Sequence, residues 1–404
     1  MSEEKRNVPR LRFPGFTDPW EQRKLGELFY ERAHRSSDRD ILSVSISNGI
    51  YPASESDRDT NPGASIKNYK IVNINDIVYN SMRMWQGAVG CSKYEGIVSP
   101  AYVVVSPKTG VDSPLFGYLL KLPVMLHRFA NYSQGNSKDT LTLKFGKFAE
   151  IRVVIPVDIA EQKALSAFFQ KLDHLITLHQ RKLDHLKDMK KGLLQKMFPK
   201  TGEAVPELRF PGFTDPWEQR KALHLAEYSK GKGYSKDDLV EKGTPIILYG
   251  RLYTNYQAII DEVDTFAKPK NDAIYSQGNE VIVPASGETA EDIARASVVL
   301  LSGVLLSGDL NILRPNRHIS PLFLALTLSN GVAQRELAKR AQGKSVVHIH
   351  NSDIQDVIIS FPIMKEQTQI GAFFQQLDTL ITLHQRKLDH LKDMKKGLLQ
   401  QMFV

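Results

Sequence analysis

The stretch LITLHQRKLDHLKDMKKGLLQ, Leu175–Gln195, decides the plan of this chain, because it recurs letter for letter as Leu380–Gln400. The second copy lies 205 positions after the first, and all 21 residues are identical. Identity over such a length and at such a distance indicates that the chain contains two copies of one structural plan. The sequence therefore predicts an internal pseudo-two-fold repeat.

Apolar residues follow a four-three spacing through each copy and through the sequence before it, and eight of the ten positions in each series are apolar. This spacing is typical of a coiled coil, because a broad globular face carries more apolar positions per turn. The ten positions, called the helix seam below, are Leu165, Phe169, Leu172, Ile176, His179, Leu183, Leu186, Lys190, Leu193 and Met197 in the first copy, and Ile370, Phe374, Leu377, Ile381, His384, Leu388, Leu391, Lys395, Leu398 and Met402 in the second. Each series predicts a helix of about 39 residues, roughly 58 Å long.

The two predicted helices could each lie on a domain of their own or pack on each other. A narrow seam of this length covers little of a globular domain, so we favour pairing. In a parallel pair Lys190 would lie beside Lys395, which places like charges in the seam. In an antiparallel pair Lys190 falls near Leu377 and Lys395 near Leu172, so each aliphatic stem can lie on a leucine with its ammonium in water. We therefore predict an antiparallel coiled coil.

A second repeat precedes each variable region. The motif LRFPGFTDPWEQRK, Leu11–Lys24, recurs as Leu208–Lys221 with an offset of 197 residues, so the sequence between the repeats differs in length between the copies. Its Pro-Gly and Asp-Pro dipeptides favour turns, and its aromatic residues are expected to anchor those turns in a core. The Asp-Pro-Trp element lacks the second proline and the Tyr or Phe of a base-flipping methylation motif. We therefore interpret this repeat as structural.

Two regions with the same order of elements and different sequences lie between the repeats. Their apolar, β-branched segments predict strands, and a longer apolar pattern in each predicts a helix. The predicted strands are Ile41–Ser47, Lys70–Asn80, Ala101–Ser106 and Ile151–Ile155 in the first region, and Ile246–Tyr249, Val281–Pro284, Val298–Leu306 and Val357–Phe361 in the second; the predicted helices are Pro114–Phe129 and Pro321–Ala341. One scaffold therefore presents two different surfaces.

The fold class predicted from these patterns is α+β, with two mixed, strand-rich domains and two long helices paired as an antiparallel coiled coil. Each domain ends with a Gln-Gly turn, at Gln134-Gly135 and Gln342-Gly343, before its last strand. The predicted segments are 1–24, an N-terminal segment with the first aromatic repeat; 25–155, the first variable domain; 156–198, a central long helix; 199–221, a linker with the second aromatic repeat; 222–360, the second variable domain; and 361–404, a distal long helix.

Composition restricts the class of protein. At 404 residues the chain is long enough for two to three domains, and 42% hydrophobic with 24% charged residues is ordinary for a water-soluble protein. No apolar run reaches about 18 residues and MSEEKRNVPR has no apolar core, so neither a membrane span nor a signal peptide is predicted. The single cysteine, Cys91, excludes an internal disulfide and fits a reducing cytoplasm, where we expect the protein. A net charge of +8 favours a polyanionic partner.

Motifs for catalysis or cofactor binding are absent from the sequence. Gly343-Lys344-Ser345 matches only the end of a phosphate-binding loop, because Ala338 stands where its first glycine belongs. His348 and His350 on a predicted alternating strand are more typical of a surface than of a zinc site. No serine lies in a nucleophile elbow, and no Gly-x-Gly-x-x-Gly follows a strand. We predict no catalytic residue, no metal site and no cofactor bound by this chain.

Basic and amide side chains cluster in the predicted loops of both variable domains. Such loops contact DNA phosphates through Lys and Arg and base edges through Arg, Asn and Gln, although surface loops are commonly basic without binding anything. The candidate DNA-binding residues are Arg32, Arg35, Arg83, Gln86, Lys93, Asn136 and Lys138 in the first domain, and Lys230, Lys232, Tyr249, Arg251 and Lys344 in the second. Residues 20–155 carry 17 basic and 13 acidic side chains, but residues 217–360 carry 16 and 17. The second domain must therefore bind through patch geometry rather than net charge.

The arrangement resembles the specificity subunit of type I restriction–modification enzymes. Three features carry the resemblance, which covers nearly the whole chain: the LHQRKLDHLKDMKKGLLQ blocks, the Phe-Pro-Gly-Phe-x-Asp-Pro-Trp blocks, and the Gly135 and Gly343 turns ahead of a strand, a proline and a Glu-Gln pair. No family pattern identifies base-contacting residues in the variable domains, so the basic residues above rest on their chemistry alone.

The resemblance implies a function that the sequence motifs do not show directly. Each variable domain would be a target recognition domain that reads one half of a bipartite, asymmetric site in double-stranded DNA. The paired helices would fix the spacer and dock two modification subunits, which bind S-adenosylmethionine and methylate adenine. A separate restriction (motor) subunit, with ATP and Mg, would cut the DNA. The chain itself would be a non-catalytic specificity subunit with no membrane association.

Two other classes stay open from the residues alone. The recognition half of a single-chain methyltransferase or nuclease would need a cofactor loop and either a Pro-Pro-Tyr/Phe motif or metal-binding carboxylates, none of which occurs here. A free-standing DNA-binding regulator fits the positive charge, but it does not explain long helices with wide polar flanks. Co-elution with a methyltransferase subunit would distinguish these classes.

Overall fold

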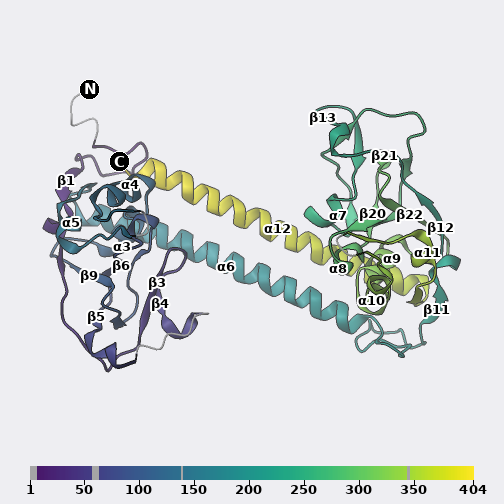
Figure 1. The fold of residues 1–404 in the computed structure, drawn as a ribbon, viewed down its shortest axis with the longest axis horizontal. Coiled ribbons are helices and arrows are strands. Elements are labelled where there is room, and N and C mark those ends of the chain that lie inside the picture. Colours follow the sequence, from purple (N-terminus) through teal and green to yellow (C-terminus); the bar gives the residue numbers. More distant parts are fainter. Residues whose placement is uncertain (1–6, 57–62, 138–139, 344–345) are drawn as a thin grey trace. The chain divides into compact units, whose positions relative to one another are not determined.

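The computed structural model describes residues 7–56, 63–137, 140–343 and 346–404, and it divides the chain into two compact units (Figure 1). The first unit joins the chain up to His179 with Lys387–Val404, and the second is Gln180–Arg386. Each unit therefore contains one variable domain and part of both long helices. None of the described helices has the length and apolar character needed to cross a membrane.

The two long helices are α6 (Ile159–Met197) and α12 (Met364–Met402), each of 39 residues, so the predicted helices are confirmed. Asp158 begins α6 by accepting a hydrogen bond from the backbone N–H of Ala160 at 2.7 Å. Glu161 and Glu366 lie in the first turns, where a negative charge is favourable beside the exposed helix N–H groups.

The helices pair antiparallel, as predicted. In the first unit Lys395 Nζ lies 2.5 Å from Asp173 Oδ1, and in the second Lys190 Nζ lies 2.5 Å from Asp378 Oδ1. In an antiparallel pair, the numbers of facing residues have a constant sum. The sum is 568 for both Lys–Asp pairs, so both follow one antiparallel register. The prediction that each lysine ammonium lies in open water was wrong. Each lysine reaches the aspartate that follows the predicted leucine, because the Lys190 and Lys395 side chains are only 20% and 24% exposed and a partly dehydrated charge is stabilised by a counter-ion.

The seam side chains are buried or half-buried along both helices. Fully buried seam residues include Leu165, Phe169, Leu183, Leu186, Ile370, Phe374 and Leu388, whereas Ile176, Leu193, Ile381 and Leu398 are half-buried. Each end of the seam joins the core of a variable domain. Leu165, Phe169 and Met402 belong to the main core of the first unit, and Leu186, Met197 and Phe374 belong to that of the second.

The first variable domain is built on a four-stranded antiparallel sheet of order β2-β9-β6-β7. Three antiparallel pairs flank it, and short helices cover it. The sheet strands are β2 (Phe29–Glu31), β9 (Tyr102–Pro107), β6 (Ile77–Asn80) and β7 (Val89–Cys91); the pairs are β1 (Glu21–Lys24) with β10 (Arg152–Ile155), β3 (Leu42–Ser45) with β4 (Gly49–Pro52), and β5 (Lys70–Val72) with β8 (Gly96–Val98); the helices are α2 (Leu25–Leu28), α3 (Ser113–Leu119), α4 (Pro123–Tyr132) and α5 (Phe145–Glu150), with 3-10 turns η1 (Ala53–Glu55), η2 (Gly63–Asn68) and η3 (Met84–Gln86).

Two predicted elements of the first domain are interrupted. The strand Lys70–Asn80 is two strands, β5 and β6, because Asn75 adopts φ 70° in the turn between them. Asparagine tolerates this left-handed conformation better than most residues. The helix Pro114–Phe129 is two helices, since Pro123 starts α4 and has no N–H with which to continue α3.

The second variable domain contains two five-stranded sheets, of order β12-β22-β18-β20-β15 and β13-β16-β14-β21-β17. Only β14–β21 and β15–β20 are parallel pairs among the described strands. The first sheet comprises β12 (Ala226–Lys230), β22 (Leu310–Pro315), β18 (Glu280–Pro284), β20 (Ser297–Val299) and β15 (Ile259–Ile260); the second comprises β13 (Leu239–Val240), β16 (Phe266–Ala267), β14 (Thr244–Ile247), β21 (Ser302–Leu306) and β17 (Tyr275–Gln277); the remaining pairs are β19 (Ser286–Gly287) with β23 (Val347–His348) and β11 (Glu218–Lys221) with β24 (Ile358–Phe361); the helices are α7 (Arg251–Thr254), α8 (Ala290–Ile293), α9 (Pro321–Leu328), α10 (Gly331–Arg340) and α11 (Asn351–Gln355), with 3-10 turns η5 (Ala222–His224) and η6 (Lys236–Asp238).

Four predictions for this domain were wrong in detail. The helix Pro321–Ala341 is two helices, α9 and α10, because Asn330 is extended and Gly331 begins α10 with φ 67°. Val298–Leu306 is not one strand, because β20 and β21 belong to different sheets. Tyr249 lies in the turn before α7 rather than at the end of a strand. His350 does not continue the strand of His348, because its backbone N–H donates to Asp353 at 2.8 Å and so begins α11.

The aromatic repeat attaches each variable domain to a long helix in the same way. The N–H of Leu11 donates to the carbonyl of Gln401 at 3.0 Å, and that of Leu208 donates to Lys196 at 2.8 Å. Behind this contact, Arg12 forms two hydrogen bonds of 2.7 and 2.8 Å to Glu161. Arg209 and Glu366 repeat them at the same distances. Both glutamates are buried, so each pair is an internal clamp, in agreement with the structural interpretation of the motif.

Candidate functional site

In the first domain, the turn after β6 holds two of the predicted residues on the surface. Met84 is completely buried and anchors η3 in the core. Gly87, with φ 93°, ends η3. The indole N–H of Trp85 donates to the Met82 carbonyl at 3.1 Å. Arg83 and Gln86 are exposed on either side of this anchored turn, so their side chains are free to reach a ligand.

The Gln-Gly turn lies directly beside that turn. Gln134 exchanges two backbone hydrogen bonds with Thr142, of 3.0 and 2.9 Å, and Leu143 donates its N–H to the Ser81 carbonyl at 2.8 Å. A Cβ on Gly135 would lie 2.5 Å from the Thr140 carbonyl oxygen, so only glycine fits there. Asn136 is exposed on this turn, whereas Lys138 lies outside the described residues.

The second domain repeats this arrangement with other residues. Gln342 exchanges backbone hydrogen bonds of 3.1 and 2.8 Å with His348, and Ile349 donates its N–H to the Ala285 carbonyl at 3.0 Å. Gly343 adopts φ 143°, and an added Cβ would lie 1.8 Å from the Val346 carbonyl oxygen. The predicted Lys344 lies outside the described residues.

Two equivalent surfaces therefore follow the central strands β6 and β18. We call residues 81–86 with 134–137 and 140–143 the first loop pair, and residues 285–289 with 342–343 and 346–349 the second loop pair. The same backbone hydrogen bonds hold both, although only the Gln-Gly dipeptide and a nearby serine recur in sequence. The backbone frame is constant, and the exposed side chains on it differ.

Other predicted residues lie on separate loops. Arg35 and Lys93 are exposed in the first domain, and Arg35 donates to Asn68 at 3.2 Å. In the second domain Lys230 is exposed at the end of β12, and Lys232 forms a solvent-exposed ion pair of 3.0 Å with Asp272. Exposed pairs of this kind are weak, so Lys232 can exchange its partner for a phosphate.

Two predicted arginines are engaged within the fold. Arg32 donates at 3.0 Å to Asp76 and to Ser106, and that serine donates to the same buried carboxylate at 2.6 Å. Arg251, only 12% exposed, pairs with Asp264 at 2.7 Å and also donates to the Glu262 carbonyl at 2.9 Å. Arg251 lowers the pKa of the Asp264 carboxyl by hydrogen bonding to it. Both guanidinium groups hold loops together, which the sequence pattern of basic loops could not distinguish from ligand binding.

Tyr249 connects the predicted residues to the second loop pair. Its exposed ring packs edge-on against Tyr253 with centroids 5.9 Å apart, and the Tyr253 hydroxyl donates to the Ser286 carbonyl. Ser286 Oγ in turn lies 3.1 Å from His348 Nδ1. Sequence reasoning missed Ser286 and assigned no role to His348, because the strands that bring them together, β19 and β23, have only two residues each.

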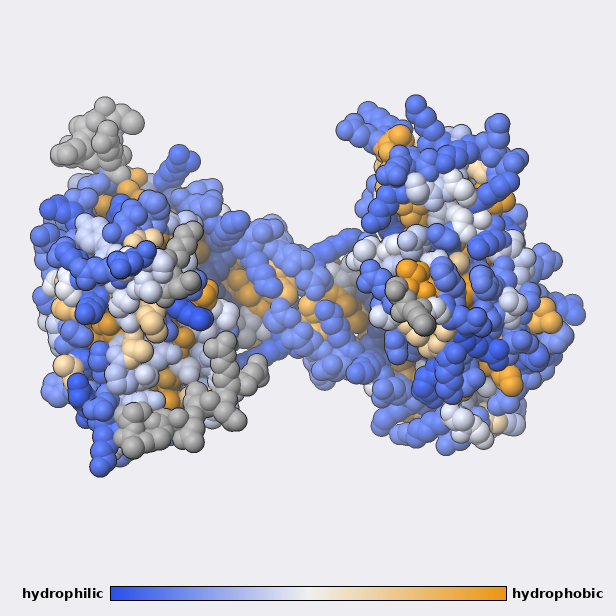
Figure 2. Space-filling model, viewed as in Figure 1, coloured by the Kyte–Doolittle hydropathy of each residue, from blue (hydrophilic) through white to orange (hydrophobic). Residues whose placement is uncertain are grey.

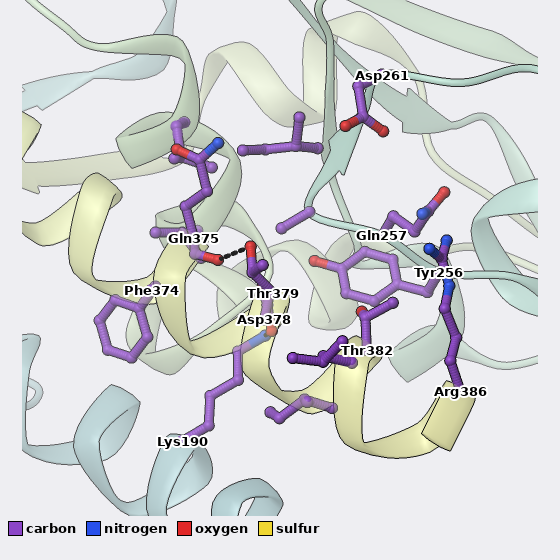
Figure 3. Close-up of a pocket in the computed structure, with 16 residues that line it drawn as sticks. Lys190, Tyr256, Gln257, Asp261, Phe374, Gln375, Asp378, Thr379, Thr382 and Arg386 are labelled. Atoms are coloured by element: carbon purple, nitrogen blue, oxygen red, sulfur yellow. Dashed lines mark hydrogen bonds and ion pairs between the residues drawn. The ribbon is translucent and has the colours of Figure 1, made fainter. Parts of the chain in front are cut away.

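A cavity of about 390 Å³ lies between α12 and the second variable domain (Figure 3). Tyr256, Thr379 and the Lys190–Asp378 pair line it together with apolar side chains such as Phe374. Within the described part of the chain, no group of three or more His, Cys, Asp or Glu side chains is placed to hold a metal ion. Burial raises the pKa of the Cys91 thiol to about 11, so it is a poor nucleophile at neutral pH.

The exposed surface of the long helices carries a repeated apolar feature. Leu175 and Leu178 of α6 are both 46% exposed, and their counterparts Leu380 and Leu383 of α12 are 45% and 60% exposed. Figure 2 shows apolar patches on the helices among hydrophilic residues. Each unit therefore presents one such leucine pair outside its seam.

A family profile described as the type I restriction modification DNA specificity domain matches this chain twice, at residues 17–188 and 214–393. The chain belongs to that family. As a type I specificity subunit it recognises DNA sequence and is non-catalytic. The matched ranges together cover most of the chain and follow its internal repeat.

One relative resembles this chain in sequence, and solved structures resemble it in fold. The specificity subunit of the type I restriction enzyme MjaVIII from Methanocaldococcus jannaschii is 20% identical over 351 residues, which cover 83% of this chain and 79% of that protein. The crystal structure of the type I restriction–modification system S subunit from M. genitalium has a TM-score of 0.58 at 12% identity, with 98% of this chain and 99% of that one covered. A chain solved in a study of complex assembly and conformational transition of the type I R-M system has a TM-score of 0.53 at 14% identity, with 98% and 99% covered.

Proposed function

We propose that each variable domain reads one half of a bipartite, asymmetric DNA site. The observation that carries this proposal is that the two domains have the same flanking elements and different interiors. The pairs β1–β10 and β11–β24 have the same register on the same EQRK sequence, yet the domains between them have different sheets. Two different reading surfaces on one repeated scaffold would give two different half-sites.

The exposed predicted residues are the proposed DNA contacts. Lysines and arginines would bind phosphates, and Arg, Gln and Asn would reach base edges. The proposed contacts are Arg35, Arg83, Gln86, Lys93 and Asn136 in the first domain and Lys230, Lys232 and Tyr249 in the second, with Lys138 and Lys344 beside the Gln-Gly turns. Arg32 and Arg251 would support these loops from inside rather than touch DNA.

The helices would fix the spacer and dock two modification subunits. The leucine pairs Leu175/Leu178 and Leu380/Leu383 support this, since two identical apolar pairs suit two copies of one partner. Those subunits would bind S-adenosylmethionine and methylate adenine in the cytoplasm, and a motor subunit with ATP and Mg would cut the DNA. This chain would bind none of these cofactors itself.

Domain exchange tests the central proposal. Residues 25–155 are replaced by the variable domain of another specificity subunit with the same flanking motifs, and methylated sites are sequenced from cells that carry the modification subunit. We expect the first half-site to change and the second to stay, because the two domains belong to separate compact units. Exchange of residues 222–360 is the matched control and should give the reverse result. Changes in both half-sites after either exchange would refute modular reading.

A further inference from the structure

The second loop pair carries a hydrogen-bonded Ser286–His348 pair on its surface. Ser286 Oγ lies 3.1 Å from His348 Nδ1, and the strands of these residues, β19 and β23, pair in antiparallel register with Ser286 opposite His348. Ser286 is half-buried, whereas the His348 side chain is exposed. The serine can therefore orient the imidazole ring while the ring itself remains open to a ligand.

Three further contacts fix the backbone of the two segments that bear this pair. The Tyr253 hydroxyl donates to the Ser286 carbonyl, Gln342 exchanges two backbone hydrogen bonds with His348, and Ile349 donates to Ala285. Ala285 and Ile349, on either side of the pair, are buried. Two short strands are thus held rigidly, as a residue that reads a base edge requires.

The chemistry of the pair suits a base edge rather than a phosphate. When Ser286 donates to Nδ1, the outer Nε2 of His348 carries a proton and donates; when Nδ1 donates to Ser286, Nε2 accepts. A single directed donor or acceptor distinguishes base edges in the major groove, such as the acceptors of guanine and the exocyclic amino group of adenine. Among the described residues, the exposed side chains that follow Ser286, Glu288 and Thr289, bring no positive charge for a phosphate.

The first domain has an equivalent loop pair, in which Thr142 takes the place of His348 in the backbone hydrogen bonds to the Gln-Gly turn. There the equivalent hydrogen bond, Leu143 N–H to the Ser81 carbonyl, joins the Gln-Gly turn to the turn that bears Arg83 and Gln86. Both of those side chains are base-reading types. The same frame thus presents Arg and Gln in one domain and a Ser–His pair in the other, which is the variation that two unlike half-sites require.

We propose that His348 reads a base of the second half-site and that Ser286 is its positioning residue. This inference rests on the proposed function, in which the second domain reads one half-site. It deepens that proposal by naming a specificity-determining pair outside the predicted basic residues. His348 supplies the contact, and Ser286 selects the ring orientation and the proton position that make the contact specific.

The experiment compares His348→Ala, Ser286→Ala and Ser286→Thr in the full chain assembled with its modification subunit. Sequencing of methylated sites first gives the native half-sites. Binding is then measured with duplexes in which each base pair of the second half-site is changed in turn. We expect His348→Ala and Ser286→Ala to reduce discrimination at one base pair of the second half-site by about tenfold, with the first half-site unchanged. Ser286→Thr should retain discrimination, because threonine keeps the hydroxyl group.

The control is His318→Ala, which removes another exposed histidine of the same domain. The backbone carbonyl of His318 accepts a hydrogen bond from Gln367 at the start of α12. Thermal unfolding of every variant checks that the fold is retained, which is expected because the substituted side chains are not in the core. Unchanged discrimination in His348→Ala would overturn the inference. Equal losses of discrimination in Ser286→Ala and Ser286→Thr would overturn the role of Ser286. Loss of discrimination in the first half-site would instead refute modular reading, so the two failures are distinguishable.

Discussion

Arg12 and Arg209 show how single residues fix the repeated frame. Each guanidinium forms two parallel hydrogen bonds to a buried glutamate at the start of a long helix, and Arg12 also donates to the Asp18 carbonyl at 2.6 Å. Hydrogen bonding to the carboxylate raises the pKa of each arginine, so both guanidinium groups stay positively charged. In the first unit the Trp20 indole N–H adds a hydrogen bond of 3.3 Å to Glu161.

Removal of one partner from such a clamp should be costly. We expect Glu161→Ala to lower the free energy of unfolding of the first unit by about 3 kcal/mol, because it leaves the Arg12 charge buried without a counter-ion. Glu366→Ala should do the same to the second unit. The double variant Arg12→Met with Glu161→Leu should lose much less, since no charge stays uncompensated. Urea titration measures all three, and equal losses in the single and double variants would contradict the explanation.

At the scale of elements, the helix pair combines an apolar seam with one Lys–Asp pair per unit. Lys395 lies 5.2 Å above the Tyr118 ring, and the Tyr118 hydroxyl donates to the second oxygen of Asp173 at 2.9 Å. Lys190 and Asp378 border the cavity beside α12 instead (Figure 3). The same sequence block therefore has different neighbours in the two units, and its Lys–Asp contact is the part that both retain.

A double-mutant cycle should detect that contact. With Lys190→Met, Asp378→Asn and the combined variant, we expect a coupling energy of about 1 kcal/mol, because the side chains are only partly exposed. Lys395 and Asp173 should give a similar value. The solvent-exposed pair Lys200–Glu207 is the control and should show little coupling. Chemical denaturation provides the energies, and coupling near zero at both seam pairs would show that the apolar seam alone holds the helices.

At the scale of the whole molecule, the helices belong to both compact units, since α6 and α12 each cross the division of the chain. A change of helix length must therefore be made in both helices, at Lys182 in α6 and at its repeat equivalent Lys387 in α12, to preserve the antiparallel register. Four residues at each point form a stutter, which a coiled coil absorbs by local unwinding.

Such paired insertions test whether the helices determine the spacer. Four residues add about 6 Å of helix. With a rise of about 3.4 Å per base pair, we expect the spacer between the methylated half-sites to lengthen by one or two base pairs. Both half-sequences should stay the same, because no loop is altered. Sequencing of methylated sites from cells with the modified chain gives the result, and an unchanged spacer would show that the helices do not set it.

The sequence by itself determined the repeat, the two long helices and their antiparallel direction. These follow from identical blocks and heptad spacing, which are local properties that a long helix expresses directly. The order of strands and helices within each variable domain was also predictable from the sequence pattern. Asn75 and Pro123 interrupt two predicted elements of the first domain. Exposed basic residues were predictable as a class, since charge and loop position are both visible in the sequence.

Only the tertiary structure decided which of those residues are free. Arg32 and Arg251 look like ligand-binding arginines in sequence. In the folded chain Asp76 and Asp264, 44 and 13 residues away, form ion pairs with them. Ser286 and His348, 62 residues apart, form a surface pair because two short strands meet. Contacts of this kind depend on chain segments that fold together from distant positions, and no local pattern records them.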